Sequence, residues 1–233
     1  MNNTLFDLPE SNPGHPAKYT ISLFRALVQF ARGSRRLLDP FGGTGRIFLL
    51  SKWFPEMEIR AVEIEREWAK INPKTIIGSA LALPFPDNYF DTICTSPTYG
   101  NRLSDFTLPY SKGGRFSYVD SIGRRLHSDN SANFLWGDKY RDFHERAWLE
   151  ALRVLGIGGK FILNIKNHIK DGKEQLVTEW HIETLRRLGF EEQETIRAYV
   201  PSIRFGKNYD KRIEYESVIK FVLKRKYEVR PCP

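Results

Sequence analysis

Cysteine is scarce in this sequence, and its scarcity excludes several kinds of site. Only two cysteines occur among 233 residues, Cys94 and Cys232, and their separation does not fit a metal-binding pair. No apolar run approaches the roughly 18 residues that cross a bilayer. The N-terminus lacks the pattern of a signal peptide. We therefore expect a cytoplasmic protein with reduced cysteines, no bound metal and no membrane contact.

Acidic residues are fewer than basic ones, which favours a polyanionic partner. The formal net charge is +8. Between Arg197 and Lys226, nine Lys and Arg residues stand against three acids. A basic surface that is only solvated, with no partner, is an alternative explanation for this excess of Lys and Arg. Because five tryptophans and ten tyrosines are also available for stacking on bases, we expect a nucleic acid as partner.

A glycine-rich loop, Asp39–Arg46 (DPFGGTGR), follows the short apolar run Leu37-Leu38. Ligands of open α/β sheets bind where parallel strands end, and glycines there let the backbone turn sharply and approach a ligand. The loop lacks the Gly-Lys-Ser/Thr of a phosphate-binding loop, which disfavours a nucleoside triphosphate. Asp39 suits a cationic or hydroxylated ligand better than a pyrophosphate. An ordinary strand-to-helix turn remains an alternative.

Glu63 ends the next predicted strand, residues 57–63. It follows the glycine-rich loop by about twenty residues, the spacing at which an acid binds ribose hydroxyls in dinucleotide-binding folds. A helix N-cap or a first-turn acid would look the same. We expect Glu63 to bind a ribose.

A second loop, Thr95–Arg102 (TSPTYGNR), follows the run Thr92-Ile93-Cys94. Ser96 can donate or accept a hydrogen bond, whereas Pro97 offers only a carbonyl acceptor. Tyr99 presents a flat face on which a base can stack. Together these groups suit a planar substrate with an exocyclic amine. A proline-containing turn with an ordinary packed tyrosine is the alternative.

The two loops together resemble those of the S-adenosylmethionine-dependent amino-methyltransferases of DNA. That family carries an F-x-G-x-G loop, matched by Phe41–Gly45, and a catalytic (D/N/S)-P-P-(Y/F/W) tetrapeptide. Ser96–Tyr99 matches the tetrapeptide except that Thr98 replaces the second proline. The segment His15–Tyr19 is similar to the one that closes over the methionine end of the cofactor. The resemblance extends from His15 to the final strand and is greatest for small single-domain methylases of phages and mobile elements.

This resemblance implies S-adenosylmethionine as cofactor and double-stranded DNA as partner. Residues 78–85 resemble the part of the family that holds adenine, with Ser79 where the family usually has an acid. The cofactor-binding residues implied are Lys18, Tyr19, Asp39, Phe41, Gly42, Gly43, Gly45, Glu63, Ser79, Ala80 and Leu81. The catalytic residues implied are Ser96, Pro97 and Tyr99.

Residues 101–139 show neither helix nor strand periodicity and leave directly from the second loop. A structureless stretch of this length inside a domain is uncommon unless it is functional, so we expect a substrate-side insert. A disordered surface loop is the alternative. The substrate-binding candidates are Asn101, Arg102, Arg124, Arg125 and Trp136.

The remaining pattern predicts one domain over residues 1–233, with an Asn- and Pro-rich arm at 1–14. Strands alternate with amphipathic helices, and the last two strands form an antiparallel pair. We expect an α/β, Rossmann-like class I methyltransferase fold, a doubly wound, mostly parallel seven-stranded sheet with an antiparallel edge strand. Asn167, after the fifth strand, is a further site candidate. Strands are expected at 36–39, 57–63, 75–78, 92–94, 159–165, 190–200 and 215–223, and the main helices at 18–31, 140–155 and 175–188.

The expected reaction is methylation of an exocyclic amino group of a DNA base. Within the family, serine at the first tetrapeptide position favours cytosine N4 over adenine N6. An RNA guanine-N2 methyltransferase would use a similar site, and a protein glutamine methyltransferase usually has Asn in place of Ser96. A non-catalytic nucleic-acid-binding module with a decayed site would explain the charge, Thr98 and Ser79. The oligomeric state is not predicted.

Overall fold

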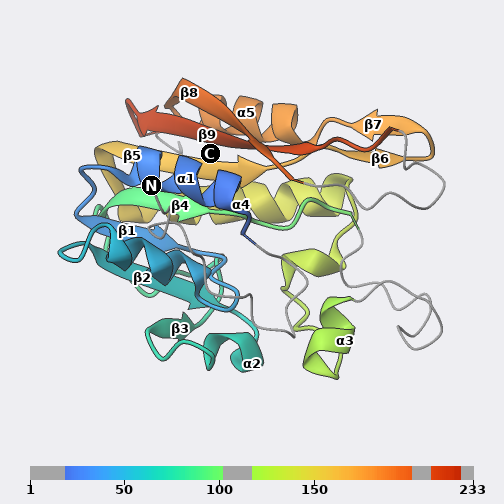
Figure 1. Cartoon of the computed structure of the whole chain (residues 1–233), viewed down its shortest axis with the longest axis horizontal. Helices are drawn as coiled ribbons and strands as arrows, with labels where there is room; N and C mark the ends of the chain where they lie inside the picture. Colours follow the sequence, from blue (N-terminus) through green and yellow to red (C-terminus); the bar gives the residue numbers. More distant parts are fainter. Residues whose placement is uncertain (1–18, 102–116, 201–210, 227–233) are drawn as a thin grey trace, which may run out of the picture.

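A seven-stranded sheet, in the order β3-β2-β1-β4-β5-β9-β8, forms the centre of the computed structural model (Figure 1). The structure describes residues 19–101, 117–200 and 211–226. The predicted α/β architecture, a doubly wound and mostly parallel seven-stranded sheet, is confirmed. The strands are β1 (Arg36–Asp39), β2 (Glu58–Glu63), β3 (Thr75–Ile77), β4 (Phe90–Thr95), β5 (Leu155–Ile165), β8 (Phe190–Tyr199) and β9 (Tyr215–Leu223).

Strands β1 to β5 are parallel, so their carboxyl ends meet at one edge of the sheet. β9 runs antiparallel to both β5 and β8, which places the reversed strand one position in from the edge strand β8. The strand order reverses between β1 and β4, because the chain goes outward from β1 to β3 and then returns. Ligands bind at such a switch point in open α/β sheets.

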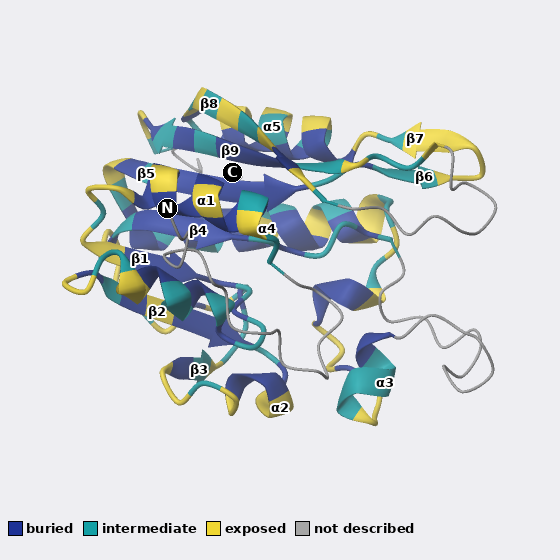
Figure 2. Ribbon diagram, in the orientation of Figure 1, coloured by how far each residue is buried: buried dark blue, intermediate teal, exposed yellow. Residues whose placement is uncertain are grey.

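Two buried clusters cover the two faces of the sheet, because successive side chains of a strand point to opposite faces. Leu37 belongs to the cluster under helix α1 (Ile21–Ala31). Leu38 belongs to the cluster under helices α4 (Asp138–Val154) and α5 (Val177–Arg187). The buried residues follow the sheet and the inner faces of these helices (Figure 2).

Shorter helical turns complete the fold at the carboxyl edge. They are the 3-10 helices η2 (Arg46–Lys52) and η4 (Ser131–Asn133) and the short helices α2 (Arg66–Ala69) and α3 (Tyr118–Ile122). None of the helices within the described ranges has the length and apolar character that would let it cross a membrane.

Residues 117–137 are more regular than the sequence predicts. Helix α3 begins with a capping box, in which Ser117 and Asp120 each bond the other's backbone N–H. Helix α4 already starts at Asp138, so the expected insert 101–139 ends earlier than predicted. The expectation of a stretch without secondary structure is therefore wrong for these residues, because five helical residues are too few to show periodicity. The N-terminal arm, 1–14, lies outside the described residues.

A small hairpin, β6 (His168–Lys170) and β7 (Lys173–Gln175), was not predicted. Asp171 and Gly172 connect its strands with φ of 51° and 74°. Positive φ at both positions is typical of a tight hairpin turn, and an Asp-Gly pair is its sequence signal. The hairpin extends beyond the sheet at the side where β5 ends (Figure 1).

Candidate active site

The glycine-rich loop, residues 39–46, packs closely on its own chain. A Cβ atom at Gly42 would lie 2.8 Å from the Cβ of Ala61 in β2. Gly45 has φ +77°, and a Cβ there would lie 2.7 Å from the Cβ of Asn72. These two glycines are therefore required by the fold of the loop itself.

A cavity lies at the carboxyl edge, between the glycine-rich loop, the catalytic loop (Ser96–Tyr99) and residues 117–133. The structure thus brings the two predicted loops to one site. Seven predicted residues line it: Tyr19, Phe41, Gly42, Gly43, Glu63, Ala80 and Ser96. The sequence did not single out Trp68, Tyr118, Asp129, Asn130 and Ser131, which form much of the remaining wall.

Glu63 ends β2 with its carboxyl group buried in this wall. Its Oε2 accepts the N–H of Gly43 at 2.7 Å, and its Oε1 accepts the N–H of Glu65 at 2.8 Å. Burial raises the pKa of Glu63 to about 7, although these two hydrogen bonds oppose the rise. Each oxygen retains a lone pair that could accept a ligand hydroxyl.

Asp39 lies behind the glycine-rich loop and does not line the cavity. Its Oδ1 accepts the N–H of Phe41 at 3.0 Å and the hydroxyl of Thr95 at 2.7 Å. Burial raises the pKa of Asp39 to about 6 against these two bonds. Asp39 therefore ties the end of β1 to the end of β4 and fixes the start of the loop.

The lining residues suit S-adenosylmethionine, which carries a positive sulfur, a ribose and an adenine. Glu63 offers a carboxylate, and Arg46 is the one basic residue among those that line the cavity. Phe41, Ile64 and Ala80 supply apolar surface for a flat ring. Within the described ranges, no group of three His, Cys, Asp or Glu residues is placed to hold a metal ion.

Asn164, at the end of β5, holds the catalytic loop. Its Nδ2 lies 3.0 Å from Ser96 Oγ, 3.0 Å from Tyr99 Oη and 2.8 Å from Glu216 Oε2. Because a carboxylate only accepts hydrogen bonds, the contact with Glu216 requires that Asn164 point its NH₂ group, and not its oxygen, toward these three partners. Ser96 Oγ and Tyr99 Oη are themselves 3.3 Å apart. One of the two amide hydrogens goes to Glu216, and the other is left for the hydroxyl pair of Ser96 and Tyr99.

A buried relay on the other side of the loop ends at the carbonyl of Thr98. Trp148 Nε1 donates to His181 Nδ1 at 3.0 Å, so the neutral ring of His181 carries its proton on Nε2. His181 Nε2 lies 3.0 Å from Tyr140 Oη, and Tyr140 donates to the Thr98 carbonyl at 2.7 Å. Burial keeps the pKa of His181 well below its usual value, so the ring stays neutral. The Thr98 carbonyl is therefore already occupied.

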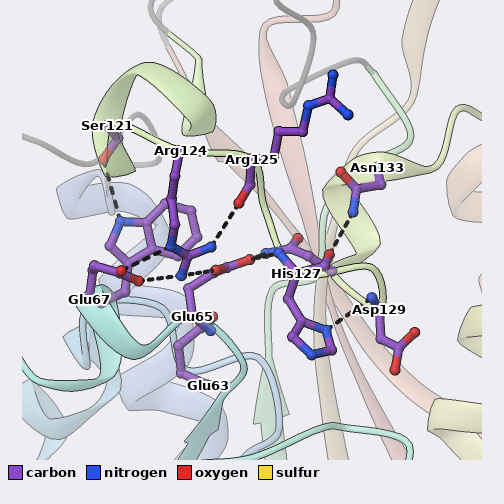
Figure 3. A network of polar contacts seen from close by, with 11 residues as sticks. Glu63, Glu65, Glu67, Ser121, Arg124, Arg125, His127, Asp129 and Asn133 are labelled. Atoms are coloured by element: carbon purple, nitrogen blue, oxygen red, sulfur yellow. Dashed lines mark hydrogen bonds and ion pairs between the residues drawn. The ribbon is translucent and has the colours of Figure 1, made fainter.

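Two predicted substrate residues, Arg124 and Arg125, follow helix α3 and have different surroundings. Arg124 Nη2 lies 2.9 Å from Glu65 Oε2 and 2.5 Å from Glu67 Oε2, so its charge is committed within the protein. The side chain of Arg125 extends away from this network (Figure 3). Of the two, Arg125 is the better placed to contact a substrate.

Trp136 packs against the chain that follows the catalytic loop. The backbone N–H of Trp136 donates to the Gly100 carbonyl at 3.0 Å. A Cβ atom at Gly100 would lie 2.8 Å from that backbone nitrogen. Asn101 follows, with a buried Oδ1 that has no hydrogen-bond partner in the described part of the chain. The predicted residues Lys18 and Arg102 lie outside the described residues.

Other predicted residues lie near the cavity without lining it. The hydroxyl of Ser79 accepts the N–H of Leu81 at 3.2 Å, and Leu81 packs on the core under α4. Pro97 is buried. Asn167 Oδ1 accepts the N–H of Thr178 at 2.7 Å, so this residue stabilises the start of α5. Within β5 and the residues just after it, Asn164 and not Asn167 contacts the catalytic loop.

Comparison with solved structures agrees with this fold. No protein-family model matches the chain. A SAM-dependent methyltransferase from Aquifex aeolicus has a TM-score of 0.51 at 12% identity, over 86% of this chain and 88% of that one. The chain has a methyltransferase fold. S-adenosylmethionine is its expected cofactor. The [4+2]-cyclase SpnF shares the fold, with a TM-score of 0.52 at 16% identity over 91% and 85%, so the fold alone does not determine the reaction.

Among curated proteins, the chain is similar to a tRNA (guanine(10)-N2)-dimethyltransferase of Pyrococcus abyssi (strain GE5 / Orsay). The two are 32% identical over 101 residues, 38% of this chain. The match spans 30% of the length of that relative.

Proposed function

We propose that this chain uses S-adenosylmethionine to methylate an exocyclic amino group of a nucleic-acid base, with guanine N2 of RNA as the favoured target. The observation that carries the proposal is a shared cavity, which Ser96 of the catalytic loop lines together with Gly43 and Glu63. The preference for RNA rests on the similarity to a tRNA guanine-N2 methyltransferase.

In this proposal, the cofactor binds on the side of the cavity that Glu63 lines. When bound, S-adenosylmethionine supplies a methyl group on a positively charged sulfur. The Glu63 carboxylate accepts hydrogen bonds from ribose hydroxyls, and its charge favours a cation nearby. Gly43 and the backbone of residue 65 hold this carboxylate in place. Phe41, Ile64 and Ala80 exclude water from the ring that they contact.

The amine side of the cavity is the side of the catalytic loop. An exocyclic nitrogen is a weak nucleophile because its lone pair is delocalised into the base. Ser96 Oγ and the Pro97 carbonyl accept hydrogen bonds from the two N–H groups of this nitrogen. These two hydrogen bonds direct the nitrogen lone pair into the cavity. Tyr99 stacks on the base. Because Asn164 and the contact between the two hydroxyls fix this pair beforehand, this is catalysis by position and preorganised dipoles.

Substitutions in the catalytic loop test this division of roles. We expect Ser96→Ala and Tyr99→Ala each to lower kcat roughly 100-fold, as loss of one preorganised polar group does. The dissociation constant for S-adenosylmethionine should stay within about twofold, because Glu63 and the glycine-rich loop are unchanged. Thr195→Ala, which removes an exposed hydroxyl on strand β8, away from the cavity lining, is the control. Loss of cofactor binding in both loop variants would contradict the assignment.

Double-stranded DNA is the second candidate substrate, with cytosine N4 favoured over adenine N6. The specific observation is the match of Ser96–Tyr99 to the tetrapeptide of the DNA amino-methyltransferases, with serine first. A base in a duplex would have to be extruded to reach the cavity.

Nucleoside analysis distinguishes the candidates. Unmodified tRNA transcripts and duplex DNA are each incubated with the protein and S-adenosylmethionine, digested and analysed by mass spectrometry. N2-methylguanosine would support the RNA proposal, and N4-methylcytosine or N6-methyladenine would support DNA. No methylated nucleoside from either substrate, with cofactor binding demonstrated, would contradict both.

A further inference from the structure

The carboxylate of Glu65 is fully buried and bonds a segment far away in the sequence. Glu65 is the N-cap residue of α2, yet its side chain makes no cap hydrogen bond. Its Oε2 lies 2.9 Å from Arg124 Nη2. Its Oε1 accepts the N–H of His127 at 2.7 Å and the Nδ2–H of Asn130 at 2.8 Å (Figure 3). A buried carboxylate needs such partners, because desolvation would otherwise be costly.

The segment that Glu65 holds, residues 117–133, is one wall of the cavity. Tyr118, Asn130 and Ser131 belong to this wall. Beside this wall, Trp68 of α2 also lines the cavity and packs on Tyr118, with ring centroids 4.8 Å apart at 79°. These two rings belong to a small buried cluster that is separate from the two clusters on the sheet.

We propose that Glu65 is a positioning residue that holds residues 117–133 closed over the bound cofactor. The inference rests on the proposed function, because it takes the cavity to be the site of S-adenosylmethionine. Besides Glu65, the wall is attached by the small apolar cluster and by polar contacts that are less buried, among them Arg124–Glu67 and Thr98–Ser131. A wall attached in this way can open while the sheet and its main core stay folded. This closure then limits how fast the cofactor leaves.

Glu67 provides a matched control on the same helix. It bonds the same arginine as Glu65, with Arg124 Nη2 2.5 Å from its Oε2, but its side chain is 45% exposed. Glu65→Gln keeps one acceptor oxygen and places an NH₂ group against groups that are themselves donors. Glu67→Gln loses an ion pair at the surface, where such pairs contribute little.

The test measures cofactor dissociation by stopped-flow, with tryptophan fluorescence as the signal and excess S-adenosylhomocysteine as competitor. We expect Glu65→Gln to raise the dissociation rate at least about tenfold, as loss of a buried charged hydrogen bond does. Glu67→Gln should stay within about twofold of the wild type. Backbone hydrogen exchange should rise over residues 117–133 in Glu65→Gln and stay unchanged in β1 and β4.

Equal dissociation rates in both variants, with unchanged exchange over residues 117–133, would overturn the proposal. If Glu65→Gln fails to fold, Arg124→Gln takes its place, and its excess over Glu67→Gln reports the loss of the bonds to Glu65 and to the Arg125 carbonyl. A wild-type protein that binds no S-adenosylmethionine would instead contradict the proposed function. Hydrogen exchange of the free protein would still decide whether Glu65 holds the segment.

Discussion

Two opposing effects act on the carboxyl group of Glu63. Burial favours the neutral acid and raises its pKa to about 7, while the N–H groups of Gly43 and Glu65 favour the carboxylate. A bound ribose would donate hydrogen bonds from its hydroxyl groups to Glu63. These bonds would favour the charged carboxylate, as the two backbone N–H groups do. In the proposed cofactor site, cofactor binding and proton binding at Glu63 are therefore coupled.

Affinity for S-adenosylmethionine should fall as the pH is lowered. Below pH 7 the free protein holds a proton on Glu63, and that proton must leave before the carboxylate can accept hydroxyl bonds. We expect the dissociation constant to rise by up to about tenfold per pH unit between pH 7 and 6. Equilibrium dialysis at fixed ionic strength measures this. Glu63→Gln should bind more weakly and lose the dependence, whereas an unchanged pH profile in that variant would contradict the coupling.

Tyr140 is the residue through which the core positions the catalytic loop. Tyr140→Phe removes the donor to the Thr98 carbonyl and the hydroxyl that faces His181. We expect a loss of about 1–3 kcal/mol in the free energy of unfolding and a lower kcat at unchanged cofactor affinity. Tyr89→Phe is the control, since its hydroxyl bonds Glu58 away from the catalytic loop. Equal kinetic effects of the two substitutions would contradict this role.

Thr98 links the catalytic loop to the segment that closes over the cavity. Its hydroxyl donates to Ser131 Oγ at 2.9 Å, a bond that a proline at this position could not make. The departure from the family tetrapeptide thus has a structural partner in this chain.

A double-mutant cycle with Thr98→Val and Ser131→Ala tests this link. We expect a coupling of about 1 kcal/mol in the free energy of unfolding, because each single substitution already removes the shared hydrogen bond. Chemical denaturation of the four proteins measures the coupling. Strictly additive effects would show that the two hydroxyls do not depend on each other.

The sequence predicts elements that repeat a local pattern and misses those that depend on distant contacts. The ends of β1 and β4 are marked by apolar runs followed by glycine or proline. Helix α3 and the β6–β7 hairpin are too short for a periodic signal, although the Asp-Gly pair marks the hairpin turn. Glu65 and Arg124 are 59 positions apart, and no local pattern connects them. Asn164 likewise bonds Ser96 across 68 positions.

Among the described residues 211–226, the basic side chains before and after β9 lie at opposite edges of the sheet. β9 is antiparallel to β5, with Ser217 opposite Ile165 and Val222 opposite Lys160. Residues 211–214 therefore lie at the carboxyl edge of the sheet, the edge that also holds the cavity, and residues 224–226 lie at the opposite edge. Lys224, in the second group, is 3.6 Å from Glu191.

This arrangement predicts that two exposed lysines differ in their effect on nucleic-acid binding. Lys211 precedes β9 and Lys224 follows it. We expect Lys211→Ala to weaken RNA binding and to reduce the slope of log K against log salt by about one. Lys224→Ala should change neither quantity. Equal effects in a fluorescence-anisotropy salt titration would contradict a binding surface at the cavity edge.

We propose that one cavity binds the cofactor beside Glu63 and receives the amine at Ser96. Isothermal titration of S-adenosylmethionine into the wild type, Glu63→Gln and Ser96→Ala tests this proposal. We expect binding to the wild type, equal binding to Ser96→Ala, and binding weakened by about tenfold or more in Glu63→Gln. No binding to the wild type, or equal affinity in Glu63→Gln and the wild type, would contradict it.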